Sequence, residues 1–235
     1  MALPEIVSRE QWLEARLRLL AQEKELTRRR DALNAERRRL PMVRVEKEYV
    51  FEGPEGKVTL AELFGECRQL FVHHIMFGPD WETGCPTCTQ YTSEFTEALV
   101  RRLRSRDTAF AMVCRAPLAK IEAYTQGRGW ALPWYSSYGS DFNYDFAVTL
   151  DRAAGQVSYN YRPEPDLACG EQPTELSGAS CFLRAGRDVF HTYSAYARGL
   201  DHVDFANAFL DLTAFGRQEP WEEPKDRAPV IHGAS

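Results

Sequence analysis

Two apolar runs in the middle of the chain predict buried strands. Residues 70–77 read Leu-Phe-Val-His-His-Ile-Met-Phe, and residues 109–114 read Ala-Phe-Ala-Met-Val-Cys. Because neither run alternates with polar residues, both faces of each strand should be covered, as in the centre of a parallel sheet. Between the runs, Phe95, Leu99 and Leu103 recur at helical spacing. The pattern predicts a strand–helix–strand unit with parallel strands and a right-handed crossover.

Weaker patterns extend this unit on both sides. Apolar and β-branched residues bounded by turn residues predict strands, proline and glycine mark the ends of helices, and a polar stretch indicates an inserted loop region. In chain order, the further predicted elements are a strand pair at 43–51 and 57–59, a helix from Pro117 to about Gly127, a loop region at 151–178, a hairpin at 180–193 and a final helix at about 200–212.

The first forty residues predict one long helix. Ser8 and Gln11 form a capping-box pattern at its start, and Pro41 ends it. Leucines repeat every seven residues along it, at positions 19, 26, 33 and 40. This stripe fits a coiled-coil arm that pairs two copies of the chain, and it fits equally a helix lying on its own domain. The expected parts are a long helix at 1–40, an α/β domain at 41–216 and an irregular tail at 217–235.

A Cys-x-x-Cys motif, Cys85-Pro86-Thr87-Cys88, stands between the first apolar run and the helix. The start of a helix carries unpaired N–H groups and a partial positive charge, and both stabilise a thiolate. Pro86 fits the first turn, where a missing N–H costs nothing. Because the thiolate is the nucleophile, we predict catalytic roles for both cysteines, with Cys85 attacking and Cys88 resolving. The rival interpretation is half of a zinc site, but a structural zinc needs four ligands and the chain has no second Cys-x-x-Cys.

The composition narrows the class of protein. With 44% hydrophobic and 27% charged residues, a chain of 235 residues suffices for one sizeable domain with extensions. A net charge of −5 argues against a general nucleic-acid binder, and no apolar run is long enough to cross a membrane. The N-terminus lacks a basic segment followed by an apolar core, so no signal peptide is expected. We therefore predict a cytoplasmic protein, in which a cysteine pair is more often catalytic or metal-binding than a static disulfide.

Several longer stretches resemble one known family. They are Phe77-Gly78-Pro79-Asp80-Trp81, Gly84-Cys85-Pro86-Thr87-Cys88, and the segments 115–121, 137–145 and 190–194. From its first helix to about Gly216, the chain resembles a bacterial thioredoxin-like family known as domain of unknown function eight-nine-nine. The resemblance implies a thioredoxin fold, and a hairpin ahead of the first core strand is typical of the peroxiredoxin-like variant of that fold. The predicted fold class is therefore α/β, thioredoxin-like, with an N-terminal helical extension.

Two departures from ordinary thioredoxins bear on the substrate. Trp81 lies four residues before Cys85, whereas thioredoxins place a tryptophan directly before the first cysteine. Gly178-Ala179-Ser180 occupies the region where thioredoxins have a cis-proline, which in them helps to hold the substrate chain and to keep metals off the thiols. The second departure argues against general protein-disulfide reduction. It favours a metal, or a small-molecule or thiol/disulfide substrate.

Two histidines supply further metal-ligand candidates. His74 lies on the strand leading to Cys85, His191 lies on the last hairpin, and both match positions of the family motifs. Thiolates together with imidazoles suit copper or zinc, and Sco-type copper chaperones use a cysteine pair and a distant histidine on a similar fold. Alternation along the strand puts His73 and His74 on opposite faces, and the family position favours His74. The rival interpretation makes both candidates hydrogen-bonded histidines of the core or its rim.

Three functions follow from these observations. The first is a thiol–disulfide oxidoreductase that needs no cofactor beyond Cys85 and Cys88. The second is a copper- or zinc-binding protein, either a carrier or a metal-dependent oxidoreductase or oxygenase, with Cys85, Cys88, His74 and His191 as candidate ligands. The third is a non-catalytic scaffold that forms a homodimer through the N-terminal helix.

Overall fold

The computed structural model describes residues 3–167 and 173–225. These residues divide into two compact units, one made of residues 3–41 and 209–225 and the other of residues 42–208. In the structure, the larger unit begins after Pro41 and ends at Ala208. The sequence predicted an α/β domain at 41–216.

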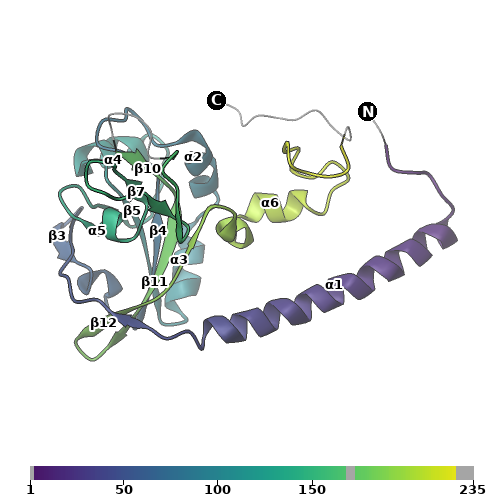
Figure 1. Cartoon of the computed structure of the whole chain (residues 1–235), viewed down its shortest axis with the longest axis horizontal. Helices are drawn as coiled ribbons and strands as arrows, with labels where there is room; N and C mark the ends of the chain where they lie inside the picture. Colours follow the sequence, from purple (N-terminus) through teal and green to yellow (C-terminus); the bar gives the residue numbers. More distant parts are fainter. Residues whose placement is uncertain (1–2, 168–172, 226–235) are drawn as a thin grey trace. The chain divides into compact units, whose positions relative to one another are not determined.

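An eight-stranded sheet forms the centre of the larger unit. Across the sheet, the strands are β1 (Val43–Arg44), β12 (Asp188–Tyr196), β11 (Gly178–Ala185), β4 (Gln69–His74), β5 (Thr108–Cys114), β6 (Trp134–Ser136), β2 (Val50–Gly53) and β3 (Gly56–Thr59). The two predicted apolar strands are β4 and β5, which are parallel neighbours, and β6 continues the parallel part. The predicted C-terminal hairpin is β11–β12, and β11 runs antiparallel to β4 (Figure 1).

The strand order identifies the fold class. In the run β12–β11–β4–β5, two parallel strands joined by a helical crossover lie beside an antiparallel hairpin that follows them in the chain. This is the strand arrangement of the thioredoxin core. The hairpin β2–β3 precedes that core in sequence and adds two strands beyond β6. The predicted thioredoxin-like α/β fold with additional N-terminal strands is therefore confirmed.

Three helices cover one face of the sheet: α2 (Pro86–Ser93), α3 (Glu97–Arg104) and α4 (Leu118–Gln126). Between β4 and β5 the sequence predicts one helix, but the chain forms two, α2 and α3. The reason is local, because the Thr96 side chain accepts a hydrogen bond from the N–H of Leu99 and so caps a new helix. Phe95 lies between the helices and packs edge-on against Phe110 of β5.

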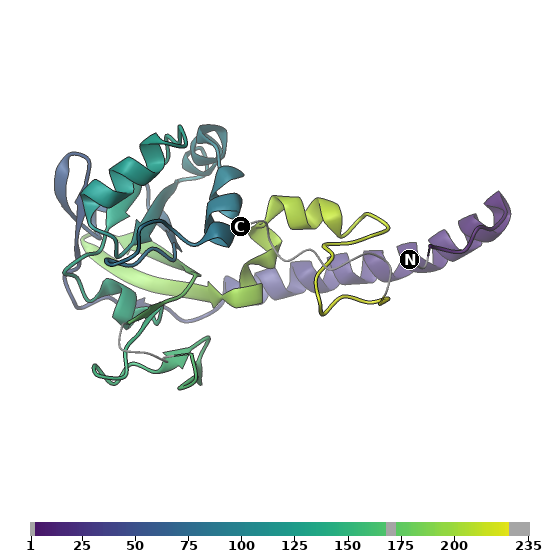
Figure 2. The same cartoon turned by 90° about the horizontal axis from the view of Figure 1, so that it is seen from above.

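The opposite face is covered by η1 (Glu62–Phe64), by α5 (Phe142–Asp145) and by an aromatic cluster around Phe142. Phe142 is fully buried and contacts the rings of Tyr49, Phe51 and Phe146. The predicted loop region contains short strands, namely β8 (Ser158–Tyr159), β9 (Arg162–Pro163) and β10 (Thr174–Glu175), the last of which pairs with β7 (Thr149–Leu150). Figure 2 shows the helices on one side of the sheet and this green segment on the other.

The chain after β12 differs from the predicted single helix at 200–212. It forms η2 (Ala197–Val203) and then α6 (Phe205–Leu210). Asp204 separates the two, because its carboxylate accepts hydrogen bonds from the backbone N–H of Asn207 (3.0 Å) and from its side-chain amide (2.6 Å). An aspartate in this role starts a new helix rather than continuing the old one. As a result, η2 turns Asp201 and Asp204 toward α2.

Helix α1 (Arg9–Arg37) matches the prediction for the first forty residues. Ser8 and Gln11 form both hydrogen bonds of the capping box, at 3.2 and 3.0 Å. None of the residues in α1 is buried, and the leucines at positions 19, 26, 33 and 40 are half exposed or more. None of the helices in the described residues is long and apolar enough to cross a membrane.

Deletion of residues 1–40 is expected to leave the thioredoxin-like unit folded. The physical reason is that α1 buries no side chain whose loss would open a cavity. Circular dichroism should show a cooperative thermal transition within a few degrees of that of the full chain. If the leucine stripe pairs two copies, light scattering should show a dimer for the full chain and a monomer after deletion. Insoluble protein, or loss of the cooperative transition, would contradict the prediction.

Candidate active site

The loop between β4 and α2 places Cys85 at the start of a helix. Cys85 is the N-cap residue of α2, and Pro86 occupies the first helical turn. The N–H of Cys85 donates to the carbonyl oxygen of Met76 over 2.9 Å, and the N–H of Thr89 donates to the carbonyl oxygen of Cys85 over 2.9 Å. The unpaired N–H groups of the first turn therefore lie at the Cys85 sulfur.

The two cysteines have opposite acidities. Hydrogen bonds from the Cys88 thiol, and then from the N–H groups of Cys88 and Thr87, lower the pKa of Cys85 to about 5 against the opposing effect of partial burial. For Cys88, the same thiol–thiolate hydrogen bond and then burial raise the pKa. Both are free cysteines, and Cys85 is partly exposed whereas Cys88 is 7% exposed. At neutral pH the pair consists of an accessible thiolate and a buried thiol.

The loop before Cys85 is held by residues of α4. Lys120 donates through its Nζ to the carbonyl oxygens of Pro79 (2.8 Å) and Trp81 (3.1 Å). A side chain at Gly84 would not fit, because its Cβ would lie 2.8 Å from the Tyr124 hydroxyl oxygen. The chain therefore reaches the start of α2 along a path that is fixed by Gly84 and Lys120. Both residues lie within the stretches that carry the family resemblance.

A buried ion pair supports the same loop from the other side. Arg115, directly after β5, donates to Glu175 over 2.7 Å, and the two side chains are 12% and 1% exposed. The second oxygen of Glu175 accepts a 2.7 Å hydrogen bond from the Thr149 hydroxyl. The guanidinium also stacks over the Tyr144 ring, 4.6 Å from its centroid. Gly78 lies against Glu175, since a Cβ there would approach the Glu175 Cγ to 3.3 Å.

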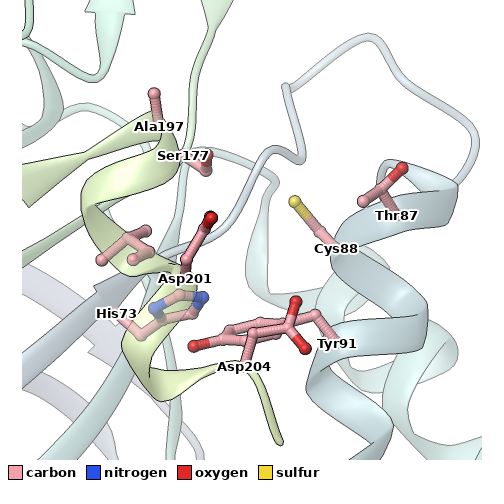
Figure 3. Close-up of a pocket in the computed structure, with 9 residues that line it drawn as sticks. His73, Thr87, Cys88, Tyr91, Ser177, Ala197, Asp201 and Asp204 are labelled. Carbon is pink, nitrogen blue, oxygen red and sulfur yellow. The ribbon is translucent and has the colours of Figure 1, made fainter. Parts of the chain in front are cut away.

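A cavity of about 150 Å³ opens beside Cys88. Its walls come from β4, α2, the segment before β11, and η2, and they include His73, Tyr91, Ser177, Asp201 and Asp204. In Figure 3 the Cys88 sulfur points from α2 toward the space between Ser177 and Asp201. The arrangement places the cysteine pair beside a small cavity that is lined in part by ionisable groups.

Comparison with known proteins places the chain in a family. A bacterial protein family of unknown function, DUF899, matches residues 1–230. The chain belongs to the DUF899 family. No curated protein matches it. Among solved structures, the chain is similar to peroxiredoxin Q of Xanthomonas campestris, with 15% identity, 69% of this chain and 89% of that chain covered, and a TM-score of 0.44.

Two other solved structures show a similar degree of likeness to this DUF899 protein. PrxQ of Xylella fastidiosa has 9% identity, covers 68% of this chain and 89% of its own, and gives a TM-score of 0.42. BsSco, a member of the Sco family of cytochrome c oxidase assembly proteins, has 14% identity, covers 73% of this chain and 92% of its own, and gives a TM-score of 0.40.

In this DUF899 protein it is His73, not His74, that faces the cysteine helix. His73 lines the cavity with Cys88 and contacts the Tyr91 ring, with 5.1 Å between ring centroids. His74 points to the other face, where its Nε2 lies 2.9 Å from the Ser180 hydroxyl and its ring packs on Phe142. The expectation that His74 points toward the thiols is therefore wrong. Alternation along β4 correctly predicted that the two side chains point in opposite directions. The prediction of which histidine faces the cysteine helix was wrong.

The second candidate histidine, His191, also lies away from the thiols. Its Nε2 is 2.8 Å from the Ser194 hydroxyl, which is 2.9 Å from the Ser180 hydroxyl that contacts His74. The two candidates are thus joined to each other through two serines, in agreement with the rival interpretation of hydrogen-bonded core histidines. Within residues 3–167 and 173–225, no group of three or more His, Cys, Asp or Glu side chains is placed to hold a metal ion.

The cavity also contains polar residues that were not predicted from the sequence, among them Tyr91, Ser177, Asp201 and Asp204. Tyr91 carries a detectable signal, because it lies three residues after Cys88 and so on the same helix face. Ser177 directly precedes the strand where thioredoxins place their cis-proline. Asp201 and Asp204 carry no such signal, since only the tertiary fold brings η2 to α2.

Proposed function

We propose that this protein is a thiol–disulfide oxidoreductase in which Cys85 is the attacking nucleophile and Cys88 the resolving thiol. The observation that carries the proposal is the asymmetry of the pair at the start of α2. The pKa of Cys85 is lowered to about 5, and its sulfur is partly accessible, whereas burial and the shared hydrogen bond keep Cys88 as a thiol. An accessible thiolate with a protonated partner one helical turn away is the arrangement that disulfide exchange requires.

In the proposed reaction, the Cys85 thiolate attacks one sulfur of a disulfide RS–SR. A Cys85–S–SR bond forms, the substrate S–S bond breaks, and RS⁻ leaves and takes up a proton. Cys88 then attacks the Cys85 sulfur, a Cys85–Cys88 disulfide forms, and the second RS⁻ leaves with the proton that Cys88 gives up. The protein dithiol is oxidised by two electrons, and one disulfide is reduced to two thiols. A reducing cytoplasm, as predicted from the sequence, would return the pair to the dithiol.

Copper binding remains the competing proposal, and its ligand set would have to differ from the one predicted. His74 and His191 contact Ser180 and Ser194 on the far face of the sheet. His73 is the imidazole on the side of the thiols. Cys85, Cys88 and His73 would be the remaining candidate ligands, since thiolates with an imidazole suit that metal, but these three side chains are not grouped to hold a metal ion in the described structure.

Thiol counting alongside metal analysis separates the two proposals. The reduced full-length protein should lose two thiols per chain on reaction with bis(2-hydroxyethyl) disulfide, and peptide mapping should find the new disulfide between Cys85 and Cys88. After copper loading and desalting, the parent and the His73→Ala variant should contain no stoichiometric copper. Copper that the parent retains but His73→Ala and Cys85→Ala lose, with no loss of thiols to the disulfide, would overturn the oxidoreductase proposal.

A further inference from the structure

The cavity beside Cys88 is lined by two carboxylates. Asp201 and Asp204 both come from the turn of η2 into α6. Asp204 accepts hydrogen bonds from Asn207, which carries no charge. Asp201 accepts a 3.2 Å hydrogen bond from Nε of Arg198, so one guanidinium offsets part of the negative charge.

A third carboxylate lies behind the cavity wall. Glu94, the C-cap residue of α2, accepts hydrogen bonds from the N–H groups of Phe205 (2.9 Å) and Ala206 (3.0 Å). The charge of Glu94 acts on a residue that lines the cavity, Tyr91. Burial raises the pKa of Tyr91, and the charges of Asp204 and then Glu94 raise it further. Asp201 and Asp204 line the cavity, and Glu94 adds a third carboxylate that acts on the Tyr91 phenol. A bound cation would lower the electrostatic energy of this region.

A buried histidine gives an independent indication of a ligand. His73 lines the cavity and is 2% exposed, and its Nδ1 has no hydrogen-bond partner among the described residues. Burial lowers the pKa of His73 to about 3, so the ring is neutral. A neutral ring nitrogen that is buried without a partner costs free energy. The His73 side chain on the cavity wall is therefore one hydrogen-bond partner short among the described residues.

The size of the cavity limits the ligand. A volume of about 150 Å³ corresponds to roughly five water molecules at about 30 Å³ each. That space admits a short aliphatic chain with one polar end, and it is too small for a folded peptide segment. Leu200, Ala197 and the Tyr91 ring supply apolar wall for such a chain. The Cys88 sulfur stands at the edge of the same space (Figure 3).

We propose that this cavity binds one half of a small aliphatic disulfide that carries an ammonium group, so that the preferred substrate is a cationic low-molecular-weight disulfide. The proposal rests on the thiol–disulfide exchange proposed above and names its substrate class. The ammonium group lies at Asp201 and Asp204, the methylene groups lie on Leu200 and Tyr91, and the disulfide sulfur faces the cysteine pair.

A cationic disulfide would react with the cysteine pair by the same two displacement steps as RS–SR. With cystamine as the substrate, Cys85 attacks one sulfur, and the first cysteamine leaves with a proton. Cys88 then displaces the second cysteamine from the mixed disulfide. The protein loses two electrons and two thiols, and one cystamine becomes two cysteamine molecules. The negative cavity therefore acts on the rate at which the mixed disulfide forms, by raising the local concentration of the cation.

Single-turnover rates with three disulfides test the proposal. The reduced full chain is mixed with excess cystamine (cationic), bis(2-hydroxyethyl) disulfide (neutral) or dithiodiglycolate (anionic), and the loss of protein thiols is followed by quenched alkylation and mass spectrometry. Each rate is divided by the rate of the same disulfide with free 2-mercaptoethanol, which removes differences in intrinsic reactivity. We expect the normalised rates to fall in the order cationic, neutral, anionic, with about tenfold between the first two.

Charge variants locate the effect. Asp201→Asn with Asp204→Asn should reduce the cationic-to-neutral ratio to about one, and 0.5 M salt should reduce it in the parent because it screens charges. The control is Asp188→Asn, which removes one carboxylate at the far end of the β11–β12 hairpin and should leave the ratio unchanged; it is compared with Asp201→Asn alone, so that each variant removes one negative charge. Because the neutral disulfide reports on each variant's folding, the ratio is interpretable for each variant.

The outcomes are distinguishable. Equal normalised rates for the three disulfides, with two thiols lost in each case, would overturn the cationic preference and leave the oxidoreductase proposal standing. The same ratio change in Asp188→Asn as in Asp201→Asn would also overturn it, because the effect would then come from net charge. If no disulfide oxidises the cysteine pair, the oxidoreductase proposal and the substrate class fail together.

Discussion

Iodoacetamide is expected to label Cys85 at least about a hundredfold faster than Cys88 at pH 7. The reason is thiolate content, because only the thiolate reacts. The pKa of Cys85 is lowered to about 5, whereas that of Cys88 is raised above its ordinary value near 9. The labelling rate of Cys85 should therefore be constant above about pH 6 and fall as the pH drops through 5. Peptide mapping by mass spectrometry measures the two sites in one sample.

The pair Cys88→Ser and Cys88→Ala tests the cause of this acidity. The largest single contribution to the low pKa of Cys85 is the hydrogen bond from the Cys88 thiol. A serine hydroxyl can still donate that bond, but alanine cannot, so the midpoint of the labelling curve should rise more in Cys88→Ala than in Cys88→Ser. The N–H groups of the first turn remain in both variants and should keep the midpoint below that of a free cysteine. Equal labelling of the two cysteines in the parent would contradict the assignment of roles.

The strands and the cysteine helix could be predicted because their signals are local. The apolar runs predicted β4 and β5 as buried parallel neighbours, and the Pro86 position marked the first turn of α2. The single helix predicted after the motif was wrong because the Thr96 cap outweighed the continuing apolar pattern. The break between η2 and α6 at Asp204 has the same cause. Side-chain caps are worth about 1 kcal/mol, which is enough to divide a helix with a weak pattern.

The candidate site was only partly predictable because it depends on which face the helices cover. Alternation showed that His73 and His74 point in opposite directions, but it carries no information about which face receives α2. The structure places Phe71 and Ile75, which alternate with His73, in the apolar cluster under the helices. Asp201 lies more than a hundred residues after Cys88, and no sequence spacing connects them. A prediction of the cavity would have required the tertiary arrangement of η2.

The buried ion pair behind the active-site loop is expected to show a large effect when one partner is removed. Arg115→Met leaves the Glu175 carboxylate 1% exposed, with the Thr149 hydroxyl as a remaining hydrogen-bond partner. Removing one partner of a buried pair typically costs about 3–5 kcal/mol, because the remaining charge has lost its compensation. Chemical denaturation at pH 7 should show a loss of that size. The double variant Arg115→Met with Glu175→Gln is the matched control and should recover most of it.

The pH dependence identifies the charge as the cause. Burial already raises the pKa of Glu175 above its ordinary value near 4.5, against the lowering effect of Arg115. Without the Arg115 guanidinium, the pKa of Glu175 in the folded state rises further. At pH values between about 4.5 and this raised pKa, the folded state therefore binds more protons than the unfolded state. Stability must then decrease as the pH increases through this window. The cost of Arg115→Met should therefore be small at pH 4 and grow toward pH 7, whereas the double variant, which has no ionisable group at position 175, should not show that growth. A cost that is equal at both pH values in the single variant would show that lost packing, not the stranded carboxylate, accounts for it.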